Sequence, residues 1–394
     1  MSRDFWIVLF SALLLRVLFA FAVYGFPPDI ACFMGWANQA AETGLFRVYS
    51  GEMYIDYPPG YVSILWVLGK LKGLFGLSDA SPAFLVLLKL PALLADLALA
   101  FLLFSLARGR LGDERALFLF ALCALNPAIG LNSALWGQVD SVFVLPLFAG
   151  MLLLVQGKLL HSATLFALAL LVKPQTLIFS PLWLFTFLER RNLVVFLKSV
   201  VAGLAVFLGV ALPFSLSRVF AIYRGAIGSY QYATLNAFNL FALLGGNWVP
   251  DTQRVFLLSF REWGYVAIGA ITLASAFLFF SGKEEERFPV VALFLAFSVF
   301  LFVHRMHERY LFPALIFAFW WYVYRPDRKV LALCFGLSAT FFINVGLILL
   351  SGFYGKYHFP RHDPWLVLVS LANLALWAFF LTLVLQRLWK EEVA

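Results

Sequence analysis

Long apolar runs separated by short polar segments constrain this chain more than any other feature. The runs have roughly 15 to 25 residues, which suits helices crossing a hydrocarbon core about 30 Å thick, whereas membrane β-barrel strands are shorter and alternate in polarity. Of the 394 residues, 63% are hydrophobic and only 13% are charged, and the mean hydropathy is +0.91. A soluble domain needs more polar surface than this. The sequence therefore predicts an all-α polytopic membrane protein.

The net charge of +8 does not indicate nucleic-acid binding. Most Lys and Arg residues lie in short clusters between apolar runs, where they orient helices in the membrane. The three cysteines, Cys32, Cys123 and Cys334, are far apart and lack the spacing of metal ligands. We therefore expect no metal site, no cofactor and no nucleic-acid partner.

The basic segment 107–115 decides the expected topology. If residues 61–76 crossed the membrane, this segment would lie outside with its three arginines, against the preference of basic loops for the cytoplasm. We therefore expect 61–76 to form an interfacial helix that begins after the prolines of "DYPPG", with Lys70 and Lys72 reaching lipid head groups.

In this topology the run Phe5–Tyr24 is a retained first helix, and residues 25–82 form a long external loop that carries surface helices. About twelve spanning helices result, with both termini in the cytoplasm. Since no linker or separate soluble tail is evident, we expect residues 1–394 to form one integrated domain.

Two acids in the external loop are candidates for catalysis. Asp29 follows the first helix, and Asp56 precedes the two prolines of "DYPPG". Each has an alternative explanation as a helix N-cap, because capping requires only a side-chain oxygen.

The segment "WGQVD" contributes Trp136, Gln138 and Asp140 just outside an apolar run. These residues either bind a sugar by stacking and hydrogen bonds or anchor a helix end at the interface. Lys173 lies between two apolar runs on the same expected side, where it either binds an anion or snorkels to the interface.

The most concentrated polar cluster is "VHRMHERYLFP", residues 303–313. It holds His304, His307, Glu308 and Arg309 within about a turn and a half of helix. It lacks the His-Glu-x-x-His spacing of a zinc site, whereas cations and imidazole donors suit a phosphate. The alternative is an ordinary anchoring cluster.

Asn236 and Asn239 in the segment 232–246 have the spacing of helix neighbours. They either line a polar cavity or cap the local backbone. The last external loop adds Lys356, His358, Arg361 and His362, which either bind an anionic group or face lipid phosphates.

The order of these motifs resembles that of a known family. An acid after the first helix is followed by "WA", then by "DYPPGY", "WGQVD", "KP" and "HRMHER". This order resembles the polytopic glycosyltransferases of the GT-C fold. It is most similar to the dolichyl-phosphate-glucose-dependent glucosyltransferases and to bacterial and archaeal mannosyltransferase-like proteins.

The resemblance implies a polyprenyl-phosphate or dolichyl-phosphate sugar donor and an active site facing away from the cytoplasm. It implies that Asp29 is the general base, that Asp56 is a second acid of the loop, and that His307 and its neighbours contact the donor phosphate. Here "HER" replaces the "HEK" of the eukaryotic glucosyltransferases, and "WGQVD" departs from their His-Gly-His-Phe-Gln pattern. The sugar is therefore left open.

Chemical reasoning leads to the same kind of donor. A sugar phosphate already carries a good leaving group, so one carboxylate suffices to deprotonate the acceptor while cations stabilise the departing phosphate. The chain has neither a G-x-G-x-x-G fingerprint nor a P-loop before a helix, which argues against a nucleotide sugar.

The expected function is thus inverting transfer of mannose or another hexose from a polyprenyl-phosphate sugar to a glycan, glycolipid or protein acceptor. His307, Arg309, His304 and Lys173 are expected to bind the donor phosphate, and the expected substrate contacts are Tyr57, Trp136, Gln138, Asp140, Asn236, Asn239 and Glu308. The acids and the basic turn should lie on the outer side of a prokaryotic cytoplasmic membrane, or on the lumenal side of the endoplasmic reticulum, and meet there.

Two alternatives keep the membrane location. A transporter or lipid flippase would use buried ionisable groups such as Asp96, which lies in the middle of an apolar run. A ligase moving a whole glycan from a lipid diphosphate would need a wider pocket with more arginines.

Overall fold

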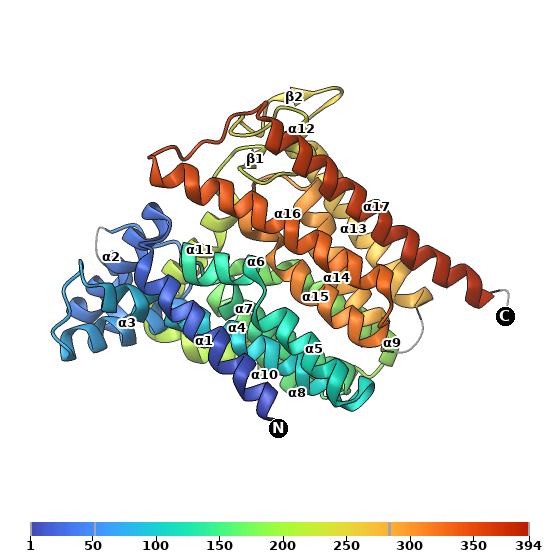
Figure 1. The fold of residues 1–394 in the computed structure, drawn as a ribbon, viewed down its shortest axis with the longest axis horizontal. Coiled ribbons are helices and arrows are strands. Elements are labelled where there is room, and N and C mark those ends of the chain that lie inside the picture. Colours follow the sequence, from blue (N-terminus) through green and yellow to red (C-terminus); the bar gives the residue numbers. More distant parts are fainter. Residues whose placement is uncertain (1, 51–52, 283–284, 393–394) are drawn as a thin grey trace. The chain divides into compact units, whose positions relative to one another are not determined.

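The computed structural model describes residues 2–50, 53–282 and 285–392 (Figure 1). The chain divides into two compact units. Unit 1 comprises Met1–Leu102, Asn132–Leu177 and Arg190–Ser229, and unit 2 comprises Leu103–Leu131, Ile178–Glu189 and Tyr230–Ala394. Both units are discontinuous in sequence. Residues 51–52 of the expected external loop and 283–284 of an expected cytoplasmic segment lie outside the described residues.

Unit 1 is built from helices alone within the described residues. Helix α7 packs on α8, α8 on α10, and α2 on α3. Its elements are α1 (Arg3–Ala22), α2 (Pro27–Thr43), η1 (Leu45–Ser50), α3 (Pro59–Leu74), the first part of α4 (Pro82–Leu111), most of the π-helix η2 (Leu131–Trp136), α7 (Asp140–Val155), α8 (Leu159–Val172), most of η3 (Pro174–Phe179), α10 (Leu193–Ala211), η4 (Leu212–Phe214) and α11 (Leu216–Gly228).

Unit 2 packs its long helices in chain order, α13 on α14, α14 on α15, α15 on α16 and α16 on α17 (Figure 1). Helix α15 is buried nearly all round, as expected of a central helix. The elements are the end of α4, α5 (Asp113–Ala124), α6 (Pro127–Gly130), α9 (Ser180–Arg190), β1 (Thr234–Leu235), α12 (Leu240–Leu243), β2 (Arg254–Val255), β3 (Leu258–Ser259), α13 (Phe260–Ser281), α14 (Arg287–Phe302), β4 (Met306–His307), η5 (Glu308–Leu311), α15 (Phe312–Tyr324), α16 (Arg328–Phe353) and α17 (Pro364–Glu392).

The four strands found in the described residues are short and form two separate pairs. Strands β1 and β4 are parallel, with Thr234 opposite Met306 and Leu235 opposite His307. Strands β2 and β3 form a tight antiparallel hairpin whose turn residues are Phe256 and Leu257. The first pair joins the segment after residue 230 to the predicted basic cluster.

Seven helices in the described part of the chain are long and apolar enough to cross a membrane. In a bilayer the backbone must satisfy its own hydrogen bonds, which is why such apolar runs become helices. The all-α, multi-pass character predicted from sequence is confirmed, while the number of about twelve spans stays a prediction. The seven are Arg3–Ala22, Pro82–Leu111, Asp113–Trp136, Leu193–Phe214, Phe260–Ser281, Arg328–Phe353 and Pro364–Leu388, and α7, α8 and α14 are shorter apolar helices.

The helix predicted after "DYPPG" is present as α3, which begins at Pro59 rather than at residue 61, and its interfacial location stays a prediction. Its 16 residues measure about 24 Å, less than the thickness of a hydrocarbon core. Its lysines do not simply reach outward. Lys70 donates to the carbonyl of Ala41 at 2.8 Å, and Lys72 pairs with Asp79 at 2.6 Å. They tie α3 to its neighbours.

Candidate active site

Asp29 occupies the first turn of α2. The helix begins at Pro27, and the N-cap position belongs to Phe26, which has no capping side chain. The alternative explanation of Asp29 as an N-cap is therefore wrong. An acid in a first turn interacts favourably with the positive end of the helix dipole, and its side chain remains available for other contacts.

Two buried side chains donate hydrogen bonds to one oxygen of the Asp29 carboxylate. Trp136 Nε1 lies 2.7 Å and Gln138 Nε2 lies 2.5 Å from Asp29 Oδ2. No hydrogen bond from the described residues is seen to reach Oδ1 of this half-buried acid. The carboxylate is thus held in one orientation by two donors, with its second oxygen available to accept a proton.

Close packing holds the start of α2 against the end of η2 and the glycine that follows it. The Phe26 ring stacks on Trp136 at 4.3 Å, and the Phe26 amide donates to the Trp136 carbonyl at 2.9 Å. Gly25 and Gly137 both have positive φ, and a Cβ at either position would lie 2.5 Å from its neighbour. Trp136 is fully buried. It acts here as a donor to Asp29 and offers no open face for stacking a sugar.

A buried ion pair supports Gln138. Lys173 Nζ lies 2.6 Å from Asp140 Oδ1 and 3.3 Å from Gln138 Oε1, and Asn132 donates to Asp140 Oδ2 at 3.1 Å. Lys173 is only 3% exposed. Its charge is compensated inside the protein, which differs from the expectation that it binds the donor phosphate. Lys173 and Asp140 orient the Gln138 amide instead.

Buried charged side chains contact two consecutive residues of the π-helix η2, Ser133 and Ala134. Ser133 donates to Asp96 at 2.5 Å, and Asp96 in turn pairs with Arg16 at 3.0 Å. Lys89, fully buried, donates to the carbonyls of Ala134 at 2.9 Å and Val23 at 2.7 Å. We call these contacts of Arg16, Asp96 and Lys89 the clamp on η2. Since π-helices are rare and tend to occur at functional sites, we assign the clamp a role in positioning Trp136 and Gln138 for their hydrogen bonds to Asp29.

Aromatic side chains lie beside the same group. The Tyr57 ring lies 5.6 Å from Lys173 Nζ and 5.1 Å from the Tyr61 ring. Burial raises the pKa of the Tyr61 hydroxyl, and the negative charge of Asp29 raises this pKa further. Tyr61, the last residue of the "DYPPGY" motif, is therefore a neutral neighbour of the acid, and its position beside Asp29 follows from the packing of α3 on α2 rather than from its place in the sequence.

Asp56 lies outside α3, whose N-cap position is occupied by Pro58 without a capping side chain. The capping explanation for Asp56 is also wrong. Burial raises the pKa of the Cys32 thiol, and the negative charges of Asp29 and then Asp56 raise this pKa further. Both acids thus act electrostatically on one thiol in the first turns of α2.

The predicted basic cluster belongs to unit 2 and forms an extended turn. Arg305 pairs with buried Asp251 at 2.6 Å, and Arg309 pairs with Glu308 at 2.8 Å. Glu308 is 3% exposed and compensates part of the local positive charge. The His307 ring contacts Tyr230 at 5.2 Å and Tyr310 at 5.1 Å. His307 is the partly exposed imidazole of the turn.

His304 differs from His307 because it is buried. It lies against Gly264, where a Cβ would overlap the imidazole, and its ring contacts Tyr265 at 5.1 Å. Burial and the positive charge of Arg305 lower the pKa of His304 to about 4. His304 is therefore neutral near pH 7 and offers no positive charge to the donor phosphate it was expected to bind.

Asn236 and Asn239 hold the backbone of unit 2 together. Asn236 Oδ1 accepts from Trp248 Nε1 at 2.8 Å, and its Nδ2 donates to the Tyr357 carbonyl at 2.8 Å. Asn239 caps α12 through Ala242 and donates to the Phe300 carbonyl at 2.9 Å. The local-capping alternative explains Asn239. Both amides use their polar atoms within the protein, which leaves them poor candidates for the expected substrate contacts.

Within the described residues, no group of three or more His, Cys, Asp or Glu side chains could hold a metal ion. The site in unit 1 thus consists of one oriented carboxylate with buried donors and aromatic neighbours. That of unit 2 consists of a basic turn with one partly exposed imidazole.

Comparison with known proteins gives structural matches. The crystal structure of ArnT from Cupriavidus metallidurans in the apo state has a TM-score of 0.53 and 15% identity, covering 97% of this chain and 77% of ArnT. The structure of the same protein bound to undecaprenyl phosphate has a TM-score of 0.54 and 14% identity, covering 98% and 78%. No protein-family model matches the chain, and no curated protein matches it.

These matches define the class of the protein by its fold. The chain is a multi-pass membrane protein with an all-α, GT-C-like fold, as the motif order led us to expect. Identities this low establish the fold alone. The predicted likeness to the dolichyl-phosphate-glucose-dependent or mannosyltransferase-like subgroups stays a prediction.

Proposed function

We propose that this protein is an inverting glycosyltransferase that uses a polyprenyl-phosphate monosaccharide as donor. The observation that carries the proposal is the Asp29 carboxylate, oriented by Trp136 and Gln138 through one oxygen. A general base requires a fixed carboxylate with an oxygen directed at the proton it removes. The ArnT structure with undecaprenyl phosphate supports this class of lipid, since it shows the same fold holding a polyprenyl phosphate.

In the proposed reaction, Asp29 Oδ1 takes the proton of an acceptor hydroxyl. The acceptor oxygen forms a bond to the anomeric carbon while the bond from that carbon to the phosphate oxygen breaks. The electron pair of the broken bond remains on the phosphate. Attack on the face opposite the phosphate inverts the anomeric centre, so a single carboxylate is sufficient.

We assign the contact with the donor phosphate to His307 and Arg309. A phosphate gains charge as it departs, and charge-assisted hydrogen bonds from guanidinium or imidazole groups stabilise it. Arg309 is bound to Glu308 through Nη1, and His307 is partly exposed. Asp56 is proposed as the second acid of the loop, acting on the acceptor.

The sugar is proposed to be mannose or another hexose, and the acceptor a lipid-linked or cell-surface glycan. The site is proposed to face the outer side of the membrane. These assignments follow from the motif order and the expected topology, and they set the panel of donors and acceptors to be assayed.

The transporter alternative has lost its main support. It relied on Asp96 as an ionisable group in the membrane, and that acid is bound to Arg16 and Ser133 in the clamp on η2. Because these contacts give the acid a structural role, we favour the transferase over the transporter. The ligase alternative is addressed by offering lipid diphosphate glycans in the assay below.

The test is an in vitro transfer assay with polyprenyl-phosphate mannose, polyprenyl-phosphate glucose and a lipid diphosphate glycan. Asp29→Asn should lower kcat by about 10²- to 10⁴-fold, because the amide cannot accept the proton. Asp79→Asn makes the same chemical change at an exposed acid in the same loop, and Lys158→Gln alters an exposed lysine elsewhere in unit 1. Both should retain wild-type kcat.

Equal rates of sugar transfer by wild type and Asp29→Asn would refute the role of the base. Transfer of only the lipid diphosphate glycan would instead favour the ligase alternative. Arg309→Gln should raise the KM for the donor and lower kcat, because the phosphate loses a cation in both the bound and the transition state.

A further inference from the structure

Unit 2 carries a set of partly exposed rings that begins at the basic turn. Around His307, the Tyr230 ring lies at 5.2 Å and the Tyr310 ring at 5.1 Å, measured between ring centroids. A second group of rings surrounds Trp248. All of these side chains are exposed or partly exposed. We call the set the aromatic strip, and its six members are Tyr230, Tyr232, Trp248, His307, Tyr310 and His358.

The second group of rings adjoins the first at residues 230–232. The Tyr232 ring lies 5.1 Å from the Trp248 ring, and His358 stacks on Trp248 at 3.9 Å with an interplanar angle of 23°. The Tyr232 amide donates to the Tyr230 carbonyl at 2.6 Å. This tight turn brings the two groups of rings together in one strip.

Backbone pairing places the two groups on either side of β1. Residues Met306 and His307 pair with β1 along one edge. Along the other edge, Asn247 forms a bridge with Thr234, and the Trp248 amide donates to the Thr234 carbonyl at 2.9 Å. Neighbouring strands lie about 4.8 Å apart, so the backbones of His307 and Trp248 are roughly 10 Å apart.

The rings are held in position by their backbone. Trp248 has a φ of 55° and Tyr230 a φ of 56°. Bulky residues adopt this left-handed region only where the surrounding structure imposes it, which occurs most often at functional sites. Trp248 Nε1 donates to Asn236 at 2.8 Å, and its carbonyl accepts from Arg361 at 3.4 Å. A ring fixed in this way loses little conformational entropy when a ligand binds.

The chemistry of the strip suits a saccharide. A pyranose ring presents C–H groups on its faces, which pack on the face of an aromatic ring, and it presents hydroxyl groups at its edge. The tyrosine hydroxyls and imidazole nitrogens of the strip can exchange hydrogen bonds with those hydroxyls. A single sugar ring is similar in size to one aromatic ring, so adjoining rings suit an oligosaccharide better than a monosaccharide.

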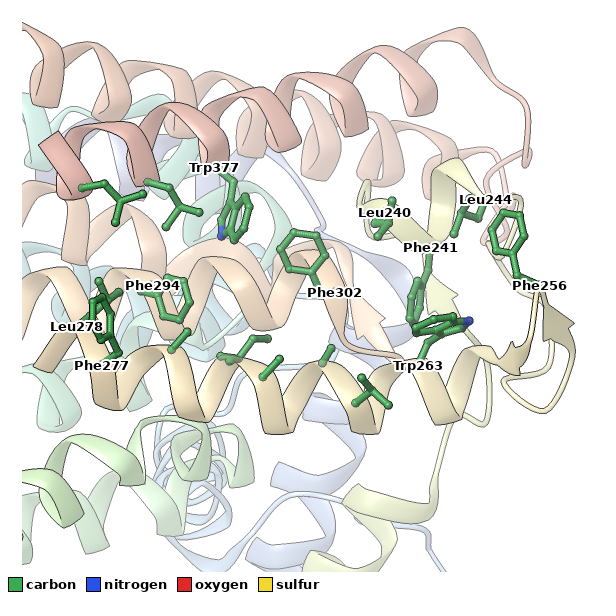
Figure 2. Close-up of a pocket in the computed structure, with 17 residues that line it drawn as sticks. Leu240, Phe241, Leu244, Phe256, Trp263, Phe277, Leu278, Phe294, Phe302 and Trp377 are labelled. Carbon is green, nitrogen blue, oxygen red and sulfur yellow. The ribbon is translucent and has the colours of Figure 1, made fainter.

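The main alternative is an aromatic belt at the membrane interface, in which Trp and Tyr place their polar edges among lipid head groups. Trp248 does not fit a belt, because its N–H is bound to Asn236. The apolar side chains of the neighbouring loop gather in a separate place. Leu240 and Phe241 line a groove together with Trp263 (Figure 2), and no member of the aromatic strip lines that groove.

We propose that the aromatic strip binds an oligosaccharide and that this oligosaccharide belongs to the acceptor. The second part rests on the proposed function, which assigns the donor phosphate to His307 and Arg309 and leaves the remaining rings for the acceptor. Binding of a sugar to the strip can be measured without any transfer reaction.

Saturation-transfer difference NMR on the purified full chain measures this binding. The probes are mannotriose, maltotriose and chitotriose, which share pyranose rings and differ in their ring substituents. At least one should bind, because stacking recognises the face of the sugar ring. Tyr232→Leu should weaken its affinity about 3- to 10-fold, since an aromatic contact is lost, and Tyr232→Phe should retain it. Tyr354→Leu is the matched control, because Tyr354 is an exposed tyrosine of unit 2 outside the strip.

Two results of this experiment would overturn the inference. One is that wild type binds none of the three sugars, or that folded Tyr232→Leu binds them as tightly as wild type does, which would leave the rings as an interfacial belt. The other concerns adenosine, a fourth probe, because nucleobases also stack on aromatic rings. Binding of adenosine in place of the sugars, weakened by Tyr232→Leu, would identify a nucleoside site instead.

The transfer assay identifies the source of the sugar. With polyprenyl-phosphate mannose as donor and the bound trisaccharide as acceptor, Tyr232→Leu should raise the KM for the acceptor about 3- to 10-fold and leave the KM for the donor near the wild-type value. A rise in the donor KM alone would assign the strip to the donor sugar and overturn the acceptor assignment. Sugar binding by a wild type that transfers nothing would refute the proposed function while supporting the binding site.

Discussion

The Trp136 side chain acts on Asp29 through a single hydrogen bond, which makes it separable from packing. Trp136→Phe removes the Nε1 donor and keeps an aromatic ring against Phe26. A hydrogen bond to a charged group contributes about 1.5–3 kcal/mol, so kcat should fall about 10- to 100-fold. The KM for the donor should stay near the wild-type value, because Trp136 is fully buried.

Steady-state kinetics of purified Trp136→Phe would decide this point. A rise in KM with unchanged kcat would mean that Trp136 contacts the sugar, as the sequence-based prediction had it. Gln138→Glu is a second test of the hydrogen bonds to Asp29, because it replaces the Nε2 donor with a carboxylate oxygen facing Asp29 Oδ2. It should lower kcat more than Trp136→Phe does.

Labelling of Cys32 reports which side of the membrane the first long loop faces, and its rate reports the pKa of the thiol near Asp29 and Asp56. It is exposed, whereas Cys123 and Cys334 are buried. A membrane-impermeant maleimide should therefore label Cys32 in intact cells if the loop is external. Labelling only after permeabilisation would reverse the expected orientation.

The rate of this labelling should depend on Asp56. The charge of Asp56 helps to raise the pKa of the Cys32 thiol, so Asp56→Asn should lower that pKa and increase the thiolate fraction at pH 8. Faster labelling in Asp56→Asn than in wild type is expected. Equal rates would show that Asp56 lies too far from the thiol to act on it.

At the scale of the element, η2 is held by a buried ion pair that crosses from α1 to α4. Removing one partner of such a pair costs about 3–5 kcal/mol, because a charge is left buried without compensation, whereas replacing both by apolar groups is much less costly. Arg16→Met should therefore lower the melting temperature more than the double variant Arg16→Met/Asp96→Leu does.

The same pair of variants separates stability from positioning. If the clamp orients Trp136 and Gln138, the double variant should regain thermal stability and still show reduced kcat, because Ser133 loses its acceptor on Asp96. Full recovery of kcat together with stability would assign the pair a purely structural role. Fluorescence-monitored unfolding and the transfer assay provide the two measurements.

At the scale of the whole molecule, His304 couples stability to pH. Its pKa in the folded chain is about 4, below the unfolded value of about 6.5. Because the unfolded chain binds the proton more tightly, the contribution of His304 is fully present above about pH 6.5 and is lost as the pH falls toward 4, by at most about 3 kcal/mol.

The melting temperature of wild type should therefore fall between pH 7.5 and pH 5, and His304→Gln should show a smaller fall over the same range. An identical pH dependence in the two proteins would show that His304 titrates normally. His358→Gln is the matched control, since this histidine is exposed in the segment between α16 and α17. Its removal should leave the dependence unchanged.

The apolar runs determined much of the whole molecule. Their length and composition are local properties, and in a bilayer they dictate helices because no other backbone partner exists. The prediction of an all-α, multi-pass protein needed nothing else, whereas the prediction of an interfacial helix after "DYPPG" also used the arginines of segment 107–115. The number of about twelve spans stays a prediction, because α7, α8 and α14 are shorter than the helices that qualify as membrane spans.

The kinds of side chain at the candidate site could also be predicted from the sequence, because an acid, an indole, an amide and a lysine lie near polar turns. The hydrogen-bond and ion-pair partners of these side chains could not be predicted. That Trp136 and Gln138 donate to Asp29 across more than a hundred residues, and that Lys173 is compensated by Asp140, depends on where the chain returns in space. Sequence spacing carries no information about such contacts.

The sequence by itself determined the membrane class, the helices and the set of polar residues available for chemistry, since all three follow from local composition. Only the tertiary structure decided which of these residues are buried, as Lys173, His304 and Asn239 are, and which acid is held in one orientation. The physical reason is that burial and hydrogen bonding are properties of contacts between distant segments. They set the charge and direction of a side chain, and with them its role.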